Sequence, residues 1–349
     1  MKAVFNRQSH LRRWLFYCSL TLSLSLWGCS EQTGAVKLSG STMGTTWHVS
    51  FLDKGVDPLD IQQGIEQELE QVNASMSTYR ADSEISRFNA LNSHQSFAIS
   101  SGFQTVLTAA LKVGLASGGA YDVTVGPIVN LWGFGPEPGA NKLPDPEQLK
   151  RLLSHVGQDK LQLDSKAKTL AKKDDLALDF SSIAKGYGVD RVALWLGNQG
   201  LRNFLVEIGG EVRVAGKNSR GGLWRIAVEQ PDAPVGELAV AVVLTDTGIA
   251  TSGDYRNYFE LAGKRFSHTI DPRTGNPVSH DLVSVTVVHT QTMMADAWAT
   301  ALMVLGAEEG MRVALAENLA VYFIRRTEHN YSASHSPLFA VYLESPREH

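Results

Sequence analysis

Residues 178–190 combine side chains and backbone features that suit the binding of a phosphate group. They read Leu-Asp-Phe-Ser-Ser-Ile-Ala-Lys-Gly-Tyr-Gly-Val-Asp and stand between an alternating apolar segment and a segment with apolar residues at helical spacing. This pattern predicts a strand-to-helix turn with Asp179 at the strand end and Ser181 or Ser182 at the helix N-cap. A helix N-terminus presents unpaired N–H groups and partial positive charge. Lys185 adds a full charge there, so the turn could hold a phosphate or diphosphate. An ordinary capped helix with a solvated lysine is the alternative interpretation.

A second set of candidate residues lies in an alanine-rich apolar segment near the C-terminus. Asp296 and Thr300 are four residues apart in a helix predicted over 293–305, so their side chains share one face. The surrounding residues are apolar, which predicts a buried face, and a buried carboxylate is costly unless it is paired or binds a cation. Carboxylate and hydroxyl oxygens suit Mg²⁺, which normally keeps waters and substrate phosphates in its shell. The alternative is an Asp296 carboxylate that hydrogen-bonds to backbone elsewhere in the core.

A polar loop at 267–275 supplies a candidate general base. His268 lies in this loop near Asp271 and Arg273. A neutral imidazole there could accept the proton of an attacking hydroxyl group. The alternative is a surface histidine without a catalytic role.

Residues 1–28 have the composition of a bacterial lipoprotein signal peptide. The segment carries four basic and no acidic residues, and its apolar run at 14–27 is too short to span a membrane comfortably. The run ends in Leu-Trp-Gly-Cys, which resembles a lipobox in which the signal is removed before Cys29 and this cysteine is lipidated. Trp27 replaces the small residue that is usual before the glycine, so an uncleaved anchor helix is the alternative.

These features predict three parts of the chain: a signal peptide at 1–28, a lipid-anchored tether at 29–37 and one large domain at 38–349. The domain is expected on the periplasmic face of the bacterial cell membrane, with the choice of inner or outer membrane left open. Apart from Cys18 in the leader and Cys29, the chain has no cysteine, which excludes disulfide and thiol chemistry in the domain. Loss of the leader takes the formal charge from −4 to −8, and no run of basic residues predicts nucleic-acid binding.

Helices are predicted mostly in the first half of the domain and strands mostly in the second half, with no repeated βαβ unit. The predicted helices span 58–76, 82–89, 103–115, 145–156, 293–305 and 307–317, and the predicted strands include 46–51, 161–163, 204–216, 224–229, 238–244, 282–288, 320–324 and 339–343. This order favours an α+β fold with mostly antiparallel sheets. The glycine- and aromatic-rich stretch at 119–135 has the composition of a loop that lines a ligand cleft.

The known nucleotide-binding fingerprints are missing from the sequence. The glycine-rich segment 133–139 contains prolines and is not followed by a predicted helix, which excludes a Rossmann turn. No Walker A loop, His-Glu-x-x-His motif or Gly-x-Ser-x-Gly elbow is found.

Several motifs, taken in order, resemble those of the ApbE-type flavin transferases, the FAD:protein FMN transferases, over nearly the whole domain. The motifs are Thr42-Met43-Gly44-Thr45, Met76-Ser77-Thr78-Tyr79, Asp82-Ser83, Phe88-Asn89, Gly209-Gly210 and the segments 119–127, 130–135, 179–186, 251–256, 268–275 and 295–300. The resemblance implies an ApbE-like, T-fold-like single domain with an FAD cleft. It also implies an Mg²⁺-dependent enzyme that moves FMN from FAD to a Thr or Ser hydroxyl of a target flavoprotein subunit and releases AMP.

The resemblance also implies roles for individual residues. FAD would contact Met43, Tyr79, Ala120, Tyr121, Asp122, Asp179, Lys185 and Ile270; Mg²⁺ would be held by Asp296, Thr300 and a main-chain oxygen at Ser182; His268 and Asp296 would serve catalysis. The implied partners are flavin-accepting subunits of membrane NADH-dependent redox pumps. Two alternatives stay open: an FAD pyrophosphatase that gives FMN and AMP, and a non-catalytic flavin-binding lipoprotein.

Overall fold

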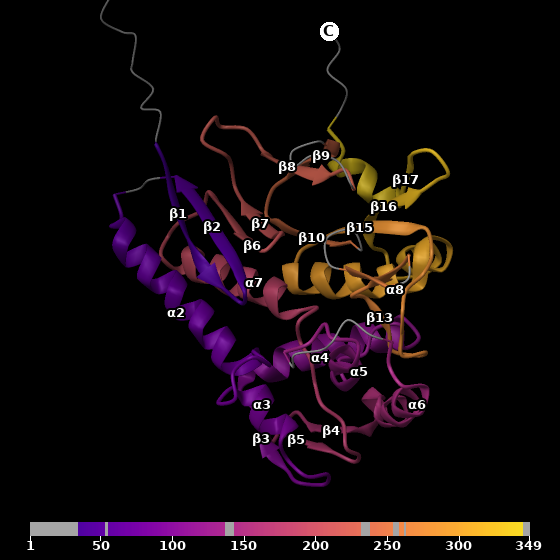
Figure 1. Cartoon of the computed structure of the whole chain (residues 1–349). Helices are drawn as coiled ribbons and strands as arrows, with labels where there is room; N and C mark the ends of the chain where they lie inside the picture. The colour runs from indigo at the N-terminus through magenta and orange to yellow at the C-terminus, as the bar shows by residue number, and fades with distance from the viewer. Residues whose placement is uncertain are drawn as a thin grey trace, which may run out of the picture. The chain divides into compact units, whose positions relative to one another are not determined.

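An eight-stranded antiparallel sheet runs through the described part of the chain (Figure 1). Its strand order is β1-β2-β6-β7-β10-β15-β16-β17. The strands span Ala35–Thr42 (β1), Thr45–Leu52 (β2), Phe204–Ile208 (β6), Glu211–Ala215 (β7), Thr247–Gly253 (β10), Leu282–His289 (β15), Ala320–Arg326 (β16) and Tyr331–His335 (β17). The computed structural model describes residues 34–52, 55–136, 143–231, 238–253, 258–261 and 263–344, so the predicted signal peptide and Cys29 lie outside the described residues.

Helices and smaller sheets surround this central sheet. The helices are α2 (Pro58–Met76), α3 (Glu84–Asn89), α4 (Ser101–Ala116), α5 (Gly126–Leu131), α6 (Pro146–His155), α7 (Ala184–Asn198) and α8 (Thr292–Ala316), with 3-10 helices η1 (Gln158–Lys160) and η2 (Pro337–Tyr342). The smaller sheets pair β3 (Phe97–Ala98) and β4 (Leu161–Asp164) with β5 (Thr169–Lys172), β8 (Trp224–Glu229) with β9 (Leu238–Leu244), β11 (Tyr258–Leu261) with β12 (Lys264–Ser267), and β13 (Ile270–Asp271) with β14 (Asn276–Pro277). Among the described residues, no helix is both long and apolar enough to cross a membrane.

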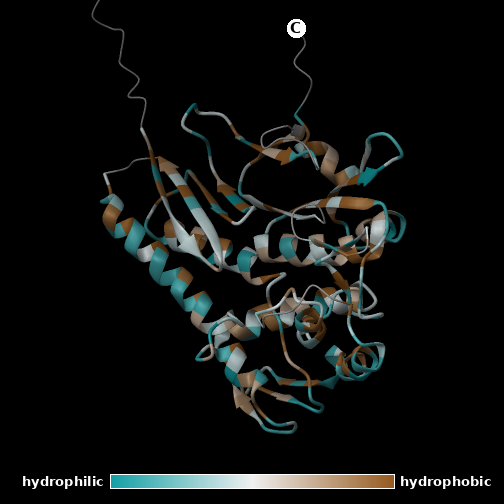
Figure 2. Cartoon of the chain, viewed as in Figure 1, coloured by the Kyte–Doolittle hydropathy of each residue, from teal (hydrophilic) through white to brown (hydrophobic). Residues whose placement is uncertain are grey.

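Two helices, α7 and α8, lie against the central sheet and against each other (Figure 1). α7 packs on β6 and β7, and α8 packs on β10 and β15. α2 covers α7 and β1, with hydrophilic positions interrupted by hydrophobic ones along its length (Figure 2). Gly64 allows this packing because a Cβ atom there would lie 1.9 Å from the Trp195 ring. α7 is thus held between the central sheet and α2, whereas α8 lies between the sheet and α4.

A separate hydrophobic cluster joins β7, β10, β15 and β16 to β8, β9 and η2. Phe339 of η2 is fully buried in this cluster and its ring lies 5.4 Å from the ring of Tyr322. The central sheet is therefore covered by apolar side chains from more than one direction.

The α+β class with a mostly antiparallel sheet is confirmed, and most predicted elements are present. The prediction of two successive helices after residue 293 matches the two segments of α8, which Gly306 separates with a φ of 76° and a ψ of 179°. The predicted strand at 339–343 is wrong, because Pro337 starts a 3-10 helix there. The predicted strand before Asp179 is reduced to one bridge between Ala177 and Val125. The last three residues of the predicted tether, 35–37, belong to β1.

Candidate active site

The first turn of α7 meets the first turns of α8 through a buried carboxylate. Asp296 is 5% exposed, and its Oδ2 accepts a hydrogen bond from the Gly186 backbone N–H at 3.0 Å. A side chain at Gly186 would not fit, since a Cβ there would lie 2.6 Å from the Thr292 carbonyl oxygen. The backbone partner that the alternative interpretation required for Asp296 is therefore present, and it belongs to the predicted phosphate-binding turn.

A second carboxylate makes the reverse connection between the same helices. Asp190 of α7 accepts hydrogen bonds from the backbone N–H groups of Thr292 at 2.9 Å and Met293 at 3.0 Å. Asp190 thus caps α8 from outside, in the way that an N-cap residue satisfies the free N–H groups of its own helix. Each helix end is fixed by an aspartate of the other helix.

Lys185 lies between two buried carboxylates. Its Nζ is 3.0 Å from Glu211 Oε1 on β7 and 3.8 Å from Asp296 Oδ1. Burial disfavours the ammonium form, but the Asp296 and Glu211 carboxylates outweigh burial and raise the pKa of Lys185. Burial raises the pKa of Asp296 and of Glu211, and Lys185 opposes both shifts. The lysine therefore stays charged and is not the solvated side chain of the alternative interpretation.

The start of α7 differs from the prediction of a serine N-cap. The helix begins at Ala184, and the residue before it, Ile183, makes no side-chain capping bond. Asp179 closes the preceding turn instead, because its Oδ1 accepts the Ser181 N–H at 2.7 Å. The Ser182 hydroxyl donates to the Tyr121 hydroxyl at 3.0 Å, and Ile183 rather than Ser182 occupies the cap position.

The segment 120–124 contacts this turn through Tyr121. Ala120 and Tyr121 are buried, and burial together with the nearby Asp296 and Asp179 carboxylates raises the pKa of Tyr121. Asp122 uses both oxygens inside the protein: Oδ1 accepts from the Thr124 N–H at 2.8 Å, and Oδ2 accepts from the Gln158 N–H at 3.0 Å. The side chain of Asp122 therefore shapes the loop.

A cavity of about 230 Å³ reaches Asp179. Its lining consists of Thr78, Ser86, Asn89, Gly126, Asn130, Pro136, Ala177, Leu178 and Asp179. Asn89 fixes one wall, because its side-chain amide donates to the Leu178 carbonyl at 2.9 Å and accepts from the Leu178 N–H at 2.8 Å. The glycine-rich stretch 119–135 thus contributes to a cavity wall, as its composition predicted.

Met43 and Tyr79, two of the predicted site residues, belong to the N-terminal part of the fold. Met43 and Gly44 form the β1–β2 turn with φ values of 49° and 73°. A Cβ at Gly188 of α7 would lie 3.0 Å from the Met43 Cε, so the methionine lies against the helix. Tyr79 follows α2, is 73% exposed, and is adjacent in sequence to the cavity residue Thr78.

His268, Ile270 and Thr300 complete the predicted set. The His268 ring lies edge-on to the Phe134 ring at 6.3 Å. Ile270 is buried in a cluster with Ile128, Trp132 and Phe259. Thr300 is partly buried on α8, one turn after Asp296. The structure joins Lys185, Asp296, Ser182 and Tyr121 around the start of α7, whereas His268 and Ile270 pack with residues of α5 and the loop after it.

The donor set around Asp296 fits a hard divalent cation. Within the described ranges, no group of three His, Cys, Asp or Glu side chains could hold a metal ion. A site here would therefore combine one carboxylate with neutral oxygens, which suits Mg²⁺ with its retained waters and substrate oxygens. Glu211 Oε2 is buried and has no hydrogen-bond partner among the described residues, which leaves an acceptor for a water molecule beside Lys185.

Sequence reasoning missed two residues of this site. Glu211 directly follows the Gly209-Gly210 turn of the β6–β7 hairpin, and its charge at the start of β7, directly before Val212, was the available signal. Asn89 belongs to one of the motifs quoted above, but the sequence assigned it no role. It hydrogen-bonds to Leu178, which lies 89 residues away in the sequence.

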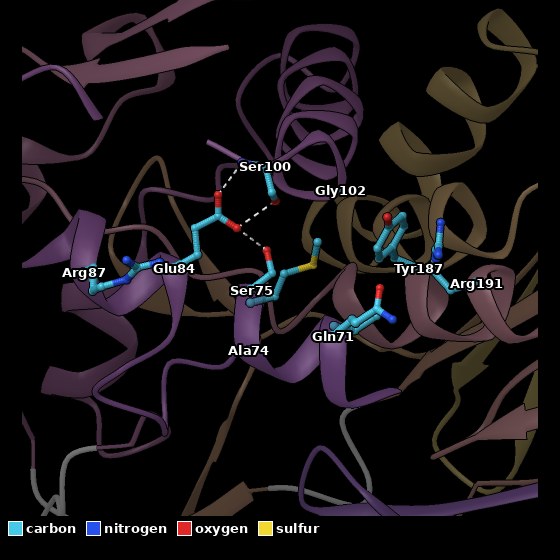
Figure 3. A pocket seen from close by; sticks show the side chains of 11 residues that line it. Gln71, Ala74, Ser75, Glu84, Arg87, Ser100, Gly102, Tyr187 and Arg191 are labelled. Atoms are coloured by element: carbon cyan, nitrogen blue, oxygen red, sulfur yellow. Dashed lines mark hydrogen bonds between the residues drawn. The ribbon is translucent and has the colours of Figure 1, made fainter. Parts of the chain in front are cut away.

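A larger cavity of about 350 Å³ lies elsewhere, between α2, α3, α4 and α7 (Figure 3). Its buried Glu84 accepts hydrogen bonds from the Ser75 hydroxyl at 2.7 Å and from the Ser100 hydroxyl at 2.7 Å. Arg191 at its edge is paired with Glu68 at 2.6 Å. These groups tie helices together, and none of the predicted site residues lines this cavity.

The fold and the site define an α+β protein in which an ammonium, a buried carboxylate and a helix end meet. In a comparison with known protein families, the ApbE family matches residues 43–323. The chain belongs to the ApbE family.

Relatives of this family match almost the whole chain. An FAD:protein FMN transferase of Haemophilus influenzae is 46% identical over 336 residues, which cover 94% of this chain and 97% of the relative. A second FAD:protein FMN transferase, of Vibrio cholerae, is 45% identical over 95% of this chain and 99% of the relative. The solved structure of the Vibrio cholerae flavin transferase ApbE has a TM-score of 0.83 at 44% identity and covers 89% of this chain and 99% of its own. The Pseudomonas stutzeri flavinyl transferase ApbE, in its apo form, also has a TM-score of 0.83 at 37% identity, over 90% of this chain and 98% of its own. The family assignment and the α+β fold are confirmed, and these named relatives are transferases.

Proposed function

We propose that this chain is an FAD:protein FMN transferase, which moves FMN from FAD to a Thr or Ser hydroxyl of a target flavoprotein subunit and releases AMP. The observation that carries this proposal is the placement of Lys185 and Asp296 together at the start of α7. FAD contains a diphosphate. At the start of α7 this anion would lie against a helix N-terminus and the fixed Lys185 ammonium.

The residues of the chain bind and orient the diphosphate. The Lys185 ammonium keeps its charge because two carboxylates stabilise it, and an ammonium has three donors of which Glu211 uses one. The dipole of α7 adds partial positive charge at its start, where the N–H groups of Ala184 and Gly186 already donate to Phe180 and Asp296. Since phosphoryl transfer depends chiefly on positioning and on charge stabilisation, these groups supply what the reaction needs.

A divalent cation, Mg²⁺ in our proposal, would be held by Asp296, the Thr300 hydroxyl and the Ser182 main-chain oxygen. When bound, it would polarise the diphosphate and screen its charge during attack on the FMN-side phosphorus. Tyr121 holds the Ser182 side chain at 3.0 Å, and Gly186 holds Asp296 at 3.0 Å. The chain thus orients the Asp296 carboxylate directly by a hydrogen bond and restrains Ser182 through its side chain.

The remaining roles follow the same proposal. Met43, Tyr79, Ala120, Tyr121, Asp122, Asp179 and Ile270 would form the flavin and adenosine parts of the FAD cleft. The contacts of Asp122 support an indirect role for its side chain, through the loop that it shapes. His268 would accept the proton of the attacking hydroxyl, and its position beside Phe134 leaves the imidazole half-buried.

The location and the partners belong to the proposal as well. Lipidation of Cys29 would anchor the domain to the periplasmic face of a membrane. Flavin-accepting subunits of membrane NADH-dependent redox pumps would then be the targets. An FAD pyrophosphatase and a flavin-binding lipoprotein remain the competing functions, and the Lys185–Asp296 pair favours chemistry at the diphosphate over storage.

One assay distinguishes these functions. The full-length chain, purified in detergent, is incubated with FAD, Mg²⁺ and an acceptor domain, and protein-bound flavin fluorescence and AMP are measured. Fluorescent acceptor with AMP supports transfer, free FMN with AMP supports hydrolysis, and bound FAD without AMP supports storage. Asp296→Ala is expected to reduce turnover by at least about 100-fold with the fold retained. Asp281→Ala, a carboxylate paired with Arg325 on the surface, is the control, and full turnover in Asp296→Ala would contradict the metal assignment.

A further inference from the structure

The two oxygens of the Asp296 carboxylate have different surroundings. Oδ2 accepts the hydrogen bond from Gly186. Within the described residues, the contact that the structure gives Oδ1 is the ion pair with Lys185 at 3.8 Å, which is longer than a hydrogen bond. Oδ1 is therefore the oxygen left to a cation, and the Lys185 ammonium is the group that competes for it.

Lys185 would be expected to close on Asp296 unless another group holds it. A lysine ammonium is a compact charge on a flexible stem, and the buried Asp296 carboxylate attracts it. Glu211 provides the restraint, since its Oε1 accepts a hydrogen bond from the Lys185 Nζ at 3.0 Å. The Lys185 ammonium thus lies closer to Glu211 of β7 than to Oδ1 of Asp296.

The hairpin that carries Glu211 also lies beside the lysine stem. Gly209 has a φ of 60°, and a Cβ there would lie 3.4 Å from Lys185 Cδ and 2.8 Å from Thr45 Cγ2. The turn therefore packs along the stem while Glu211, two residues later, holds the charged end. One short segment thus lies beside the stem and holds the charged end.

The burial of Glu211 is not explained by stability alone. The residue is 4% exposed, and its second oxygen, Oε2, has no hydrogen-bond partner among the described residues. A buried ion pair often contributes little to stability compared with an apolar replacement, and an unpartnered oxygen adds a cost. A positioning role accounts for a buried carboxylate at this position.

We infer that Glu211 is a positioning residue that holds the Lys185 ammonium off Oδ1 of Asp296, and so keeps this oxygen available to the divalent cation. The inference rests on the proposed function, because it takes Asp296 as the cation ligand. Glu211 contacts the lysine and acts on the cation only through it. Removal of Glu211 therefore weakens cation binding chiefly when Lys185 is present.

The experiment is a double-mutant cycle that measures cation binding without catalysis. Mn²⁺ is titrated into the FAD-free full-length chain, and free Mn²⁺ is followed by electron paramagnetic resonance. Glu211→Ala is expected to weaken Mn²⁺ binding about tenfold in the natural chain, as removal of an outer partner commonly does. In a Lys185→Met background the same change is expected to cost no more than about threefold.

Two further variants make the cycle decisive. Glu211→Gln keeps an oxygen that can accept from Lys185, so it should recover part of the affinity lost in Glu211→Ala; if Glu211→Ala does not fold, as judged by urea unfolding, the cycle is run with Glu211→Gln. Equal losses in the two lysine backgrounds, or no loss in either, would overturn the positioning role while leaving the proposed function intact. Equal Mn²⁺ affinity in the natural chain and in Asp296→Ala would overturn the metal assignment and this inference together.

Discussion

The Asp296 carboxylate of α8 accepts the Gly186 backbone N–H of α7 at 3.0 Å, and this bond places a candidate cation ligand directly on a helix end. Asp190 of α7 makes the reverse contact with the start of α8. Asp296 and Asp190 therefore fix the starts of α7 and α8 relative to each other. The position of the candidate cation ligand Asp296 depends on these two structural contacts.

Asp190→Ala should mainly lower stability. The change leaves the Thr292 and Met293 N–H groups without their acceptor at the start of α8, and loss of a cap of this kind costs about 1–3 kcal/mol in the free energy of unfolding. Urea unfolding followed by circular dichroism measures the effect. Asp60→Ala is the control, since Asp60 is an exposed first-turn residue of α2. Equal stability of the two variants would contradict the capping role.

Much of the fold was predictable because its helices carry strong periodic signals. Ile61, Ile65, Leu69 and Val72 repeat on one face, and the helix they predicted has the observed bounds of α2. Short segments were less predictable, since five apolar residues fit a strand or a helical turn equally well. Pro337 starts the 3-10 helix η2, and Phe339 of this helix packs against Tyr322. β17 escaped prediction because its residues are small or polar and mostly exposed.

The site was predictable wherever its residues share one element. The spacing of Asp296 and Thr300 along one helix gave their common face directly. The contact of Lys185 with Glu211 joins α7 to β7, and no spacing rule connects two residues of different elements. Such pairs follow from the register of the hairpin and the packing of the helix on the sheet, which the sequence pattern alone does not determine.

Gly209→Ala should destabilise the chain more than Gly44→Ala. Both glycines have positive φ, 60° and 73°, so alanine costs about 1 kcal/mol at either position. Only at Gly209 does the added Cβ meet other atoms, those of Thr45 and Lys185, whereas nothing lies within 4 Å at Gly44. Overpacking should add about 1–3 kcal/mol. Urea unfolding of both variants tests this, and equal losses would show that the predicted clash with Thr45 does not destabilise the β6–β7 turn.

Asn89→Ala should raise KM for FAD more than it lowers kcat. The amide of Asn89 brackets Leu178 with two hydrogen bonds and so fixes the backbone that leads to Asp179 and the cavity wall. Its loss leaves two buried backbone groups unpaired, which costs about 1–3 kcal/mol in stability and loosens the binding wall. Steady-state AMP release at varied FAD concentration separates the two constants. Asn92→Ala, at an exposed position, is the control, and an unchanged KM in Asn89→Ala would remove Asn89 from the site.

Lys172→Met should change how stability depends on pH. Lys172 is 1% exposed, its Nζ donates to the Asn89 and Leu176 carbonyls at 2.9 Å, and burial lowers its pKa below the ordinary 10.5. Between the lowered native pKa and 10.5, the unfolded chain binds more protons than the folded chain, so the free energy of unfolding rises with pH in that interval. The natural chain should therefore gain stability relative to Lys172→Met as the pH rises from 7 toward 10.5. Urea unfolding across this range measures the difference, with Lys173→Met as the neighbouring exposed control. Parallel stability curves for the natural chain and Lys172→Met would mean that the buried lysine titrates as freely in the folded chain as in the unfolded one.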